Sequence, residues 1–216
     1  ELAIDGAGHT VTLSGDTSND GDRDVLPITI GSSGVVTISS MIVVSGVDLG
    51  TGGGAIHNLG DLRVYDSLFQ DNYAYSGDGA GGGAIYSNNK LIVARSSFLD
   101  NEALRRGGAI RNLGTATVVN STVAGNKAGT LGGAIYNSNG TLTLINDTLV
   151  CNDGSIGKAV YNASGGTLDL RNSLIYGSST ISCYSPGASS GTNNYIQNNG
   201  TCPADVTTSD PKLSAL

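Results

Sequence analysis

Residues 132–137 read Gly132-Gly133-Ala134-Ile135-Tyr136-Asn137, and nearly the same six residues occur four more times in the chain. The other copies are GGAIHN from Gly53, GGAIYS from Gly82, GGAIRN from Gly107 and GKAVYN from Gly157. Their alanines are spaced by 29 and then three times by 25 residues: Ala55, Ala84, Ala109, Ala134 and Ala159. A fixed period of this length indicates a repeat architecture.

A second signal follows each of the first four copies. It is FQDN at 69–72 and FLDN at 98–101, with weaker forms VAGN at 123–126 and LVCN at 149–152. Between the two signals lies a short stretch of alternating residues, such as LIV from Leu91 and LTL from Leu142. Alternation with period two indicates a half-buried strand. The sequence therefore predicts three short strands in each coil of about 25 residues.

One repeat of this length cannot bury its own apolar face, whereas stacked copies can. Each coil would lie ~4.8 Å from the last and pair with it backbone to backbone. We therefore predict an all-β, single-domain, right-handed parallel β-helix (β-solenoid). In each GGAI copy the glycine pair would form a corner, the alanine would point inward and the isoleucine would pack in the core.

The repeat does not run evenly along the chain. Coils are expected over residues 1–178, interrupted by a polar insertion at 16–27, DTSNDGDRDVLP. The repeat fades after Ile175, so residues 179–216 are expected to form an irregular C-terminal loop or cap over the last coil.

Composition agrees with this fold and excludes several partners. The chain of 216 residues has 33 glycines and no tryptophan, and glycine disfavours helices. A net charge of −7 argues against a nucleic-acid partner, which would require a basic face. No apolar run approaches the ~20 residues of a transmembrane helix, so no transmembrane segment is expected.

Two rows of asparagine follow from the period. One row lies just after the GGAI strand and the other ends the FxxN signal. Stacked asparagine amides can hydrogen-bond along the axis of a parallel stack. We expect both rows to be structural ladders. Their members are Asn58, Asn112, Asn137 and Asn162 in the first row, and Asn72, Asn101, Asn126 and Asn152 in the second.

The position after GGAI should point outward, which would align five side chains as one stripe. Aromatic rings and an arginine on a flat sheet could hold sugar rings or a partner surface. They could equally form a ladder that only stabilises the sheet. The members of this stripe are His57, Tyr86, Arg111, Tyr136 and Tyr161.

The polar insertion contains D-x-S-x-D-G-D-x-D, which resembles the first nine positions of a calcium loop. Its oxygen-bearing residues are Asp16, Ser18, Asp20, Asp22 and Asp24. The twelfth position is Pro27 instead of the bidentate glutamate, so a solvated acidic loop is the alternative. Ca²⁺ is thus the only candidate cofactor, and the fold requires none.

A catalytic group is harder to find. Asp66, Arg95, Asp71 and Asp100 come from adjacent coils and could form an acid–base group, or be exposed charges flanking a turn. His9 and His57 lie in different coils without an evident serine or cysteine partner, so no triad or zinc site is recognisable. We therefore predict no catalytic residues and no enzyme activity.

The chain has three cysteines, so at least one cannot pair within it. Cys183 and Cys202 could close a loop in the C-terminal region as a disulfide, which an extracellular setting would favour. Two free thiols are the alternative. Cys151 is then the unpaired cysteine.

The pairing of GGAI with FxxN resembles the repeat of polymorphic outer-membrane proteins. The opening IDGAGHTVTLSG and the ending CPADVTTSDPKLSAL are similar to secreted bacterial β-helix proteins of the choice-of-anchor Q type. In that family a segment like Asp210 to Leu216 leads into further chain and a surface anchor. The resemblance implies an exported protein at the cell surface or in the extracellular matrix.

Together these observations predict a non-enzymatic extracellular β-solenoid with a structural or adhesive role. Its expected partners are further copies of itself, joined end to end into filaments or a surface layer, and surface glycans. The alternatives are a carbohydrate-binding passenger domain that uses the stripe, and a polysaccharide lyase or hydrolase acting on the outer face of the helix.

Overall fold

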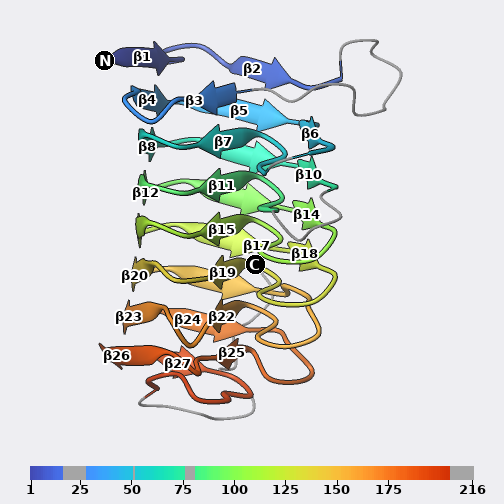
Figure 1. Cartoon of the computed structure of the whole chain (residues 1–216), viewed down its shortest axis with the longest axis vertical. Helices are drawn as coiled ribbons and strands as arrows, with labels where there is room; N and C mark the ends of the chain where they lie inside the picture. The colour runs from blue at the N-terminus through green and yellow to red at the C-terminus, as the bar shows by residue number, and fades with distance from the viewer. Residues whose placement is uncertain (17–27, 51, 76–80, 205–216) are drawn as a thin grey trace.

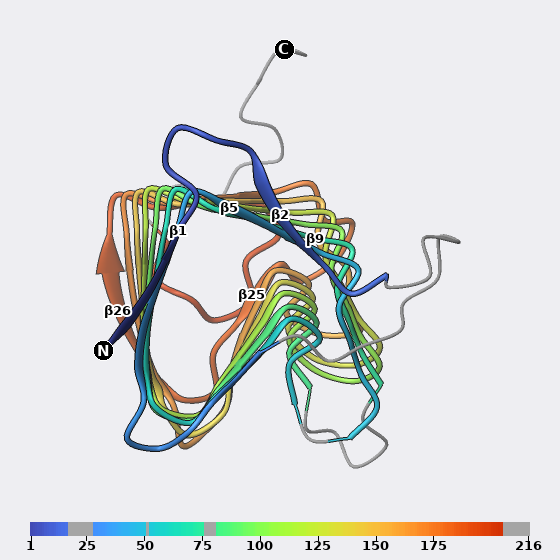
Figure 2. The ribbon, with the colours of Figure 1, turned by 90° about the horizontal axis from the view of Figure 1, so that it is seen from above.

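The computed structural model describes residues 1–16, 28–50, 52–75 and 81–204. In these ranges the chain consists of strands and turns, and every strand pairing is parallel. Coil lies upon coil along one long axis (Figure 1). Seen from the N-terminal end, the chain winds clockwise as it recedes from the viewer, which makes the helix right-handed (Figure 2). The predicted fold class, a right-handed parallel β-solenoid, is confirmed.

Three long sheets form the walls. The first sheet contains β1 (Leu2–Asp5), β4 (Val35–Ser39), β8 (Asp61–Tyr65), β12 (Lys90–Ala94), β16 (Thr115–Val119), β20 (Thr141–Ile145), β23 (Thr167–Arg171) and β26 (Ala188–Thr192). The second contains β2 (Val11–Ser14), β5 (Met41–Val44), β9 (Leu68–Gln70), β13 (Ser97–Leu99), β17 (Thr122–Ala124), β21 (Thr148–Val150), β24 (Leu174–Tyr176) and β27 (Tyr195–Ile196). The third contains β3 (Ile28–Ile30), β7 (Ile56–Asn58), β11 (Ile85–Ser87), β15 (Ile110–Asn112), β19 (Ile135–Asn137), β22 (Val160–Asn162) and β25 (Cys183–Tyr184).

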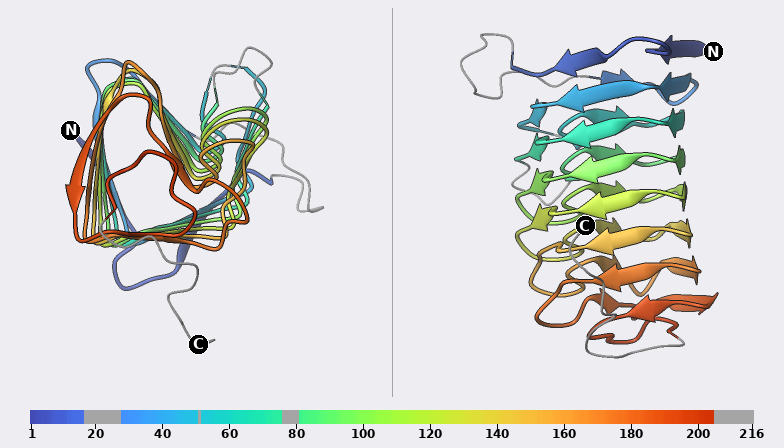
Figure 3. Two further views of the ribbon diagram at one scale, coloured as in Figure 1. Left: turned by 90° about the horizontal axis from the view of Figure 1, so that it is seen from below. Right: turned by 180° about the vertical axis from the view of Figure 1, so that it is seen from behind.

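A fourth, short sheet was not predicted. Its strands have two residues each: β6 (Val47–Asp48), β10 (Tyr73–Ala74), β14 (Glu102–Ala103) and β18 (Lys127–Ala128). They belong to an excursion of the chain between the FxxN signal and the GGAI signal, for example residues 102–108, which we call the lobe. Figure 3 shows the lobe as a smaller loop beside the main ring. Two residues are too few for alternation to show, so the sequence gives no strand signal here.

The core lies inside the main ring and follows the alternation. In the first sheet Leu62, Leu91, Ala116 and Leu142 are in register and completely buried. In the second sheet Phe69 and Phe98 stack with ring centroids 4.9 Å apart. Because each coil places the same kind of residue at the same level, one apolar column runs through the stack.

The corners depend on residues in the left-handed conformation. At the first corner, between the first and second sheets, φ lies between 49° and 58° in every coil from Ser40 onward. Asparagine and aspartate adopt this conformation several-fold more often than other side chains. The residues of this corner are Ser40, Asp66, Arg95, Asn120, Asn146, Asn172 and Asn193. The second corner, after the second sheet, has Ser45, Asp71, Asp100, Gly125, Cys151, Gly177 and Asn198.

The two glycines of GGAI are needed for different reasons. Gly107 has φ +65°, where glycine carries no steric penalty. A Cβ on Gly108 would lie 2.0 Å from the carbonyl oxygen of Gly133 in the next coil. In the copies that begin at Gly107, Gly132 and Gly157 the first glycine therefore makes the turn at positive φ. In the four copies that have a second glycine, that residue allows neighbouring coils to approach each other.

The predicted boundary at residue 178 is wrong. Strands β25, β26 and β27 continue the three sheets in register as one more coil, and of the described chain only residues 197–204 follow it. This coil could not be predicted from the sequence, because β26, ASSGT, is mostly exposed and has no apolar alternation. Backbone pairing needs no apolar side chain, so the stack continued where the pattern had faded.

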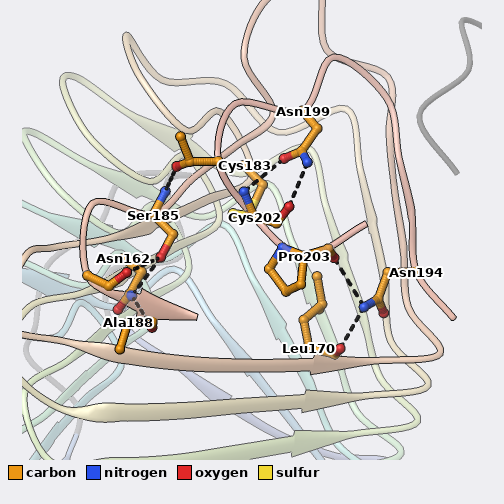
Figure 4. Close-up of a disulfide and its surroundings, with 11 residues drawn as sticks. Asn162, Leu170, Cys183, Ser185, Ala188, Asn194, Asn199, Cys202 and Pro203 are labelled. Carbon is orange, nitrogen blue, oxygen red and sulfur yellow. Dashed lines mark hydrogen bonds between the residues drawn. A yellow bond between two sulfur atoms is a disulfide. The ribbon is translucent and has the colours of Figure 1, made fainter. Parts of the chain in front are cut away.

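A loop fixed by a disulfide bond covers the C-terminal end of the core. Cys183 and Cys202 form a disulfide, with Cα atoms 5.8 Å apart, and both side chains are buried (Figure 4). Asn194 donates from Nδ2 to the Pro203 carbonyl, and Ala204 packs against the core. The loop therefore shields the last apolar layer from water. Within the described part of the chain, no helix is long and apolar enough to cross a membrane.

Candidate functional site

The asparagines of the second corner form a continuous ladder. The side-chain oxygen of Asn101 accepts the backbone N–H of Asn72 at 3.1 Å and its Nδ2 at 2.9 Å. Asn126 and Asn152 repeat the same two contacts one coil further each time. Each Nδ2 also donates to a backbone carbonyl of the preceding coil, as Asn101 does to Phe69 at 3.0 Å. All four side chains are buried, so these amides belong to the framework of the helix.

The row after the third sheet is also bonded along the axis. Asn112 donates to Asn137 at 2.8 Å, and Asn137 donates to Asn162 at 2.7 Å. Serine takes the asparagine position in two coils: Asn58 donates to Ser87 at 3.0 Å, and Asn162 donates to Ser185 at 2.9 Å. Both asparagine rows are thus occupied by internal hydrogen bonds and are not open to a ligand.

A third polar row, missed in the sequence, runs along the first corner. The backbone N–H of Ser67 donates to the hydroxyl of Ser96, and that of Ser96 donates to the hydroxyl of Ser121, both at 3.2 Å. The members of this serine row are Ser67, Ser96, Ser121, Asp147, Ser173 and Asn194. The signal was a small polar residue directly after each first-corner residue, which an ordinary turn would also produce.

Asp147 is the exception in the serine row. Its carboxylate is 1% exposed and accepts the backbone N–H of Ser121 at 2.8 Å and of Ile145 at 3.0 Å. Burial raises the pKa of Asp147 to about 7, and these two hydrogen bonds only partly oppose the shift. The chain therefore holds a carboxyl group that changes its protonation state near neutral pH inside its framework.

The predicted stripe exists, but it is not a flat exposed face. The rings of Tyr136 and Tyr161 stack at 5.6 Å, and the guanidinium of Arg111 lies 5.5 Å from the Tyr86 ring and 5.7 Å from the Tyr136 ring. His57 meets Tyr86 edge to face at 5.1 Å. Burial lowers the pKa of His57 and raises that of Tyr161.

The lobe covers the middle of the stripe. Arg106 of the lobe lies 5.3 Å from the Tyr136 ring, and Tyr136 and Arg111 are only 6% and 9% exposed. Tyr136 points away from the core, as alternation predicts, but Arg106 of the lobe lies over its ring, so the side chain is not exposed to solvent. Because the ring faces contact one another, few are left for a sugar, and the ladder interpretation fits this geometry better.

The four residues weighed as an acid–base group do not meet. Asp66 and Arg95 belong to the first corner, whereas Asp71 and Asp100 belong to the second. Strands β9 and β13 separate the two corners, a span of five residues or ~16 Å in extended chain. Asp66 is bound by Arg95 through two contacts of 2.7 Å. That hydrogen bonding lowers the pKa of the Asp66 carboxyl, which makes it a poor general acid.

The predicted calcium loop lies almost wholly outside the described part of the chain. Of the proposed calcium loop, Asp16 lies in the described chain, whereas Ser18, Asp20, Asp22 and Asp24 lie outside the described residues. Among the described residues no group of three or more histidine, cysteine, aspartate or glutamate side chains could hold a metal ion. Cys151 is an exposed free thiol at the second corner, on the side of the solenoid.

Comparison with known proteins supports the repeat type. Residues 66–88 and 120–138 match the model of the Chlamydia polymorphic membrane protein repeat. Each matched segment runs from the first corner through the second sheet and the lobe to the GGAI strand. These two segments therefore fit a repeat of the polymorphic outer-membrane protein type. No curated protein and no solved structure matches the chain.

Proposed function

We propose that this chain is a non-enzymatic structural module of an extracellular or cell-surface protein, and that its solenoid joins end to end with further copies. The match to a membrane-protein repeat supports the surface location. The continuous core and the three polar ladders support a rigid rod, because every coil is bonded to its neighbours through both backbone and side chains.

The observation that carries the association is the exposed N-terminal coil. Among the described residues, β1 and β2 have a neighbouring strand on one edge only. Leu2 is 56% and Val11 38% exposed, and the inward residues Ile4 and Leu13 are only partly buried. At the other end of the first sheet, β26 also has a neighbour on one edge only within the described chain. A strand edge of this kind is a template for pairing with another chain.

Joining β1 of one copy to β26 of another would continue the first sheet in its own direction. Such a contact uses different surfaces on the two copies, so it does not close and gives a filament. Cys151 lies two coils from the C-terminal end of the stack, so it is too far from either end to join this contact. End-to-end association should therefore persist in a Cys151→Ser variant.

The variant Ala3→Pro tests the proposal. Gly6 donates its N–H toward β4, so in the alternating pattern of a parallel strand the N–H of Ala3 points to the open edge. Proline removes that donor without removing a hydrogen bond inside the chain. We expect rods that lengthen with concentration in the native protein and in Ala3→Val, and single particles in Ala3→Pro.

Light scattering over a concentration series, with negative-stain electron microscopy, measures this difference. A native protein that stays monomeric at all concentrations would refute end-to-end association. Equal filament formation by Ala3→Pro and Ala3→Val would show that β1 is not the contact.

A further inference from the structure

A pocket lies on the outer surface at the N-terminal end of the first corner. The connection between β1 and β2 has five residues, Gly6 to Thr10, where the later first corners have one or two. The longer connection projects beyond the wall of the solenoid and overhangs the coils that follow (Figures 2 and 3). We call this connection the flap.

The pocket beneath the flap has a volume of about 490 Å³ and is open to solvent. This volume lies within the usual range of small-molecule sites, about 300–1,000 Å³. The flap contributes His9 and Thr10, and the three coils below contribute hydroxyl, charged and apolar side chains. The residues of those coils that line the pocket are Ser40, Ser67, Ser97, Asp66, Arg95, Met41, Ile42 and Leu68, of which Met41 and Ser67 have buried side chains.

The first-corner residues change at this pocket. The four corners away from it all use asparagine, which suits the left-handed backbone. The three that line the pocket are Ser40, Asp66 and Arg95, and Arg95 has φ +50° although arginine does not favour that region. Local backbone preference therefore does not explain the arginine, and residues held in unfavourable backbone conformations cluster at functional sites.

The Asp66–Arg95 pair is held in place before any ligand arrives. The guanidinium binds both oxygens of the carboxylate through Nε and Nη2 and lies 5.9 Å from the Tyr65 ring. Arginine has five N–H donors, so this pairing uses only part of its capacity. The pair carries no net charge, and a strongly charged ligand would have to break it. The remaining N–H groups and carboxylate lone pairs suit a neutral ligand that both donates and accepts hydrogen bonds.

The other lining groups suit the same chemistry. The hydroxyls of Thr10, Ser40 and Ser97 donate and accept, and Ile42 with Leu68 forms an apolar patch on the outer face of the second sheet. A saccharide ring has hydroxyl groups at its rim and an apolar C–H face, and so matches both kinds of surface. We propose that this pocket binds a neutral saccharide unit, with Arg95 and Asp66 as hydrogen-bonding residues and the flap residue His9 above them. This site is separate from the covered stripe and goes beyond the structural role proposed above.

Saturation-transfer NMR on the whole chain tests the site. The probes are the methyl glycosides of glucose, galactose, mannose and N-acetylglucosamine, with methyl glucuronide as a charged comparison. We expect transfer to at least one neutral glycoside and weaker transfer to the glucuronide. In Arg95→Asn, which restores the residue most common in this corner, the dissociation constant should rise at least about tenfold because a hydrogen bond to a charged group is lost.

Two further variants make the result specific to the pocket. His9→Ala should also weaken binding, and Asn146→Ser, at the same corner but outside the pocket, should leave it unchanged. Circular dichroism should show that all three variants stay folded. The proposal is overturned if no neutral glycoside receives saturation, if only the glucuronide does, or if Arg95→Asn binds as tightly as the native chain.

Discussion

Replacing Asn101 with alanine should lower the free energy of unfolding by about 3–5 kcal/mol, although the change removes only three heavy atoms from the side chain. The alanine would leave the backbone N–H of Asn72 without its side-chain acceptor, and would take one acceptor from the Asn72 amide and one donor from the Phe69 carbonyl. Each buried polar group left unsatisfied costs about 1–3 kcal/mol, and the small cavity adds to this. Asn101 is completely buried, so water cannot easily take over its contacts.

The matched control is Asn172→Ala, which replaces an exposed asparagine at the first corner. It should cost only about 1 kcal/mol, the penalty for alanine in the left-handed conformation. Urea denaturation measures the difference in the free energy of unfolding between the two variants. Hydrogen exchange along the coils shows whether the loss of stability extends to neighbouring coils. A solenoid need not unfold in one step, so the first transition is the one to compare. Equal destabilisation by the two variants would contradict the structural role of the ladder.

This contrast explains why the asparagine rows could be predicted. A completely buried amide must satisfy both its donors and its acceptor, and stacking identical residues at one level does so. The repeated spacing of Asn72 and Asn101 therefore carried structural information, because few other side chains could replace them. The serine row obeys the same rule, but serine is common in ordinary turns, so its spacing did not distinguish a ladder from a surface corner.

The features that the sequence analysis did not predict depend on contacts with segments outside the repeated strands. Tyr136 lies at a position that alternation sends outward, and it does leave the core. The lobe then covers it, and the lobe contains no strand long enough to leave a pattern in the sequence. The pocket is similar, because His9 and Arg95 are far apart in the chain and line the same pocket only through an enlarged corner. Sequence periodicity thus predicts the stacked framework well, and additions to that framework poorly.

Replacing Asp147 with serine should stabilise the protein above pH 7 and have little effect near pH 4. In the folded chain the pKa of Asp147 is about 7, whereas the model value for an unperturbed carboxyl is 3.8. The folded state therefore binds the proton more tightly than the unfolded state. Between these two values the unfolded chain loses the proton first, so the stability contributed by this group falls as the pH rises, and it levels off above pH 7.

The size of the effect follows from the same difference. Each pKa unit corresponds to about 1.4 kcal/mol, so a shift of roughly three units sets a limit of ~4 kcal/mol for the gain in Asp147→Ser. Serine is also the usual residue of this row, and its hydroxyl can accept the Ser121 N–H that Asp147 accepts now. The substitution therefore removes the buried charge and keeps an acceptor for the Ser121 N–H, while the Ile145 N–H loses its contact with the Asp147 carboxylate.

Thermal melts of the native chain and of Asp147→Ser between pH 4 and pH 8 test the sign and the size of the predicted stability difference. The curves should converge at the acid end and separate as the pH rises through the range from 4 to 7. Ser121→Ala is the control, since it disturbs the same row without removing a titrating group, and its cost should not depend on pH. The interpretation fails if the difference between Asp147→Ser and the native chain is constant over this range. A constant difference would mean that Asp147 titrates alike in the folded and unfolded chains, and that the framework tolerates its charge.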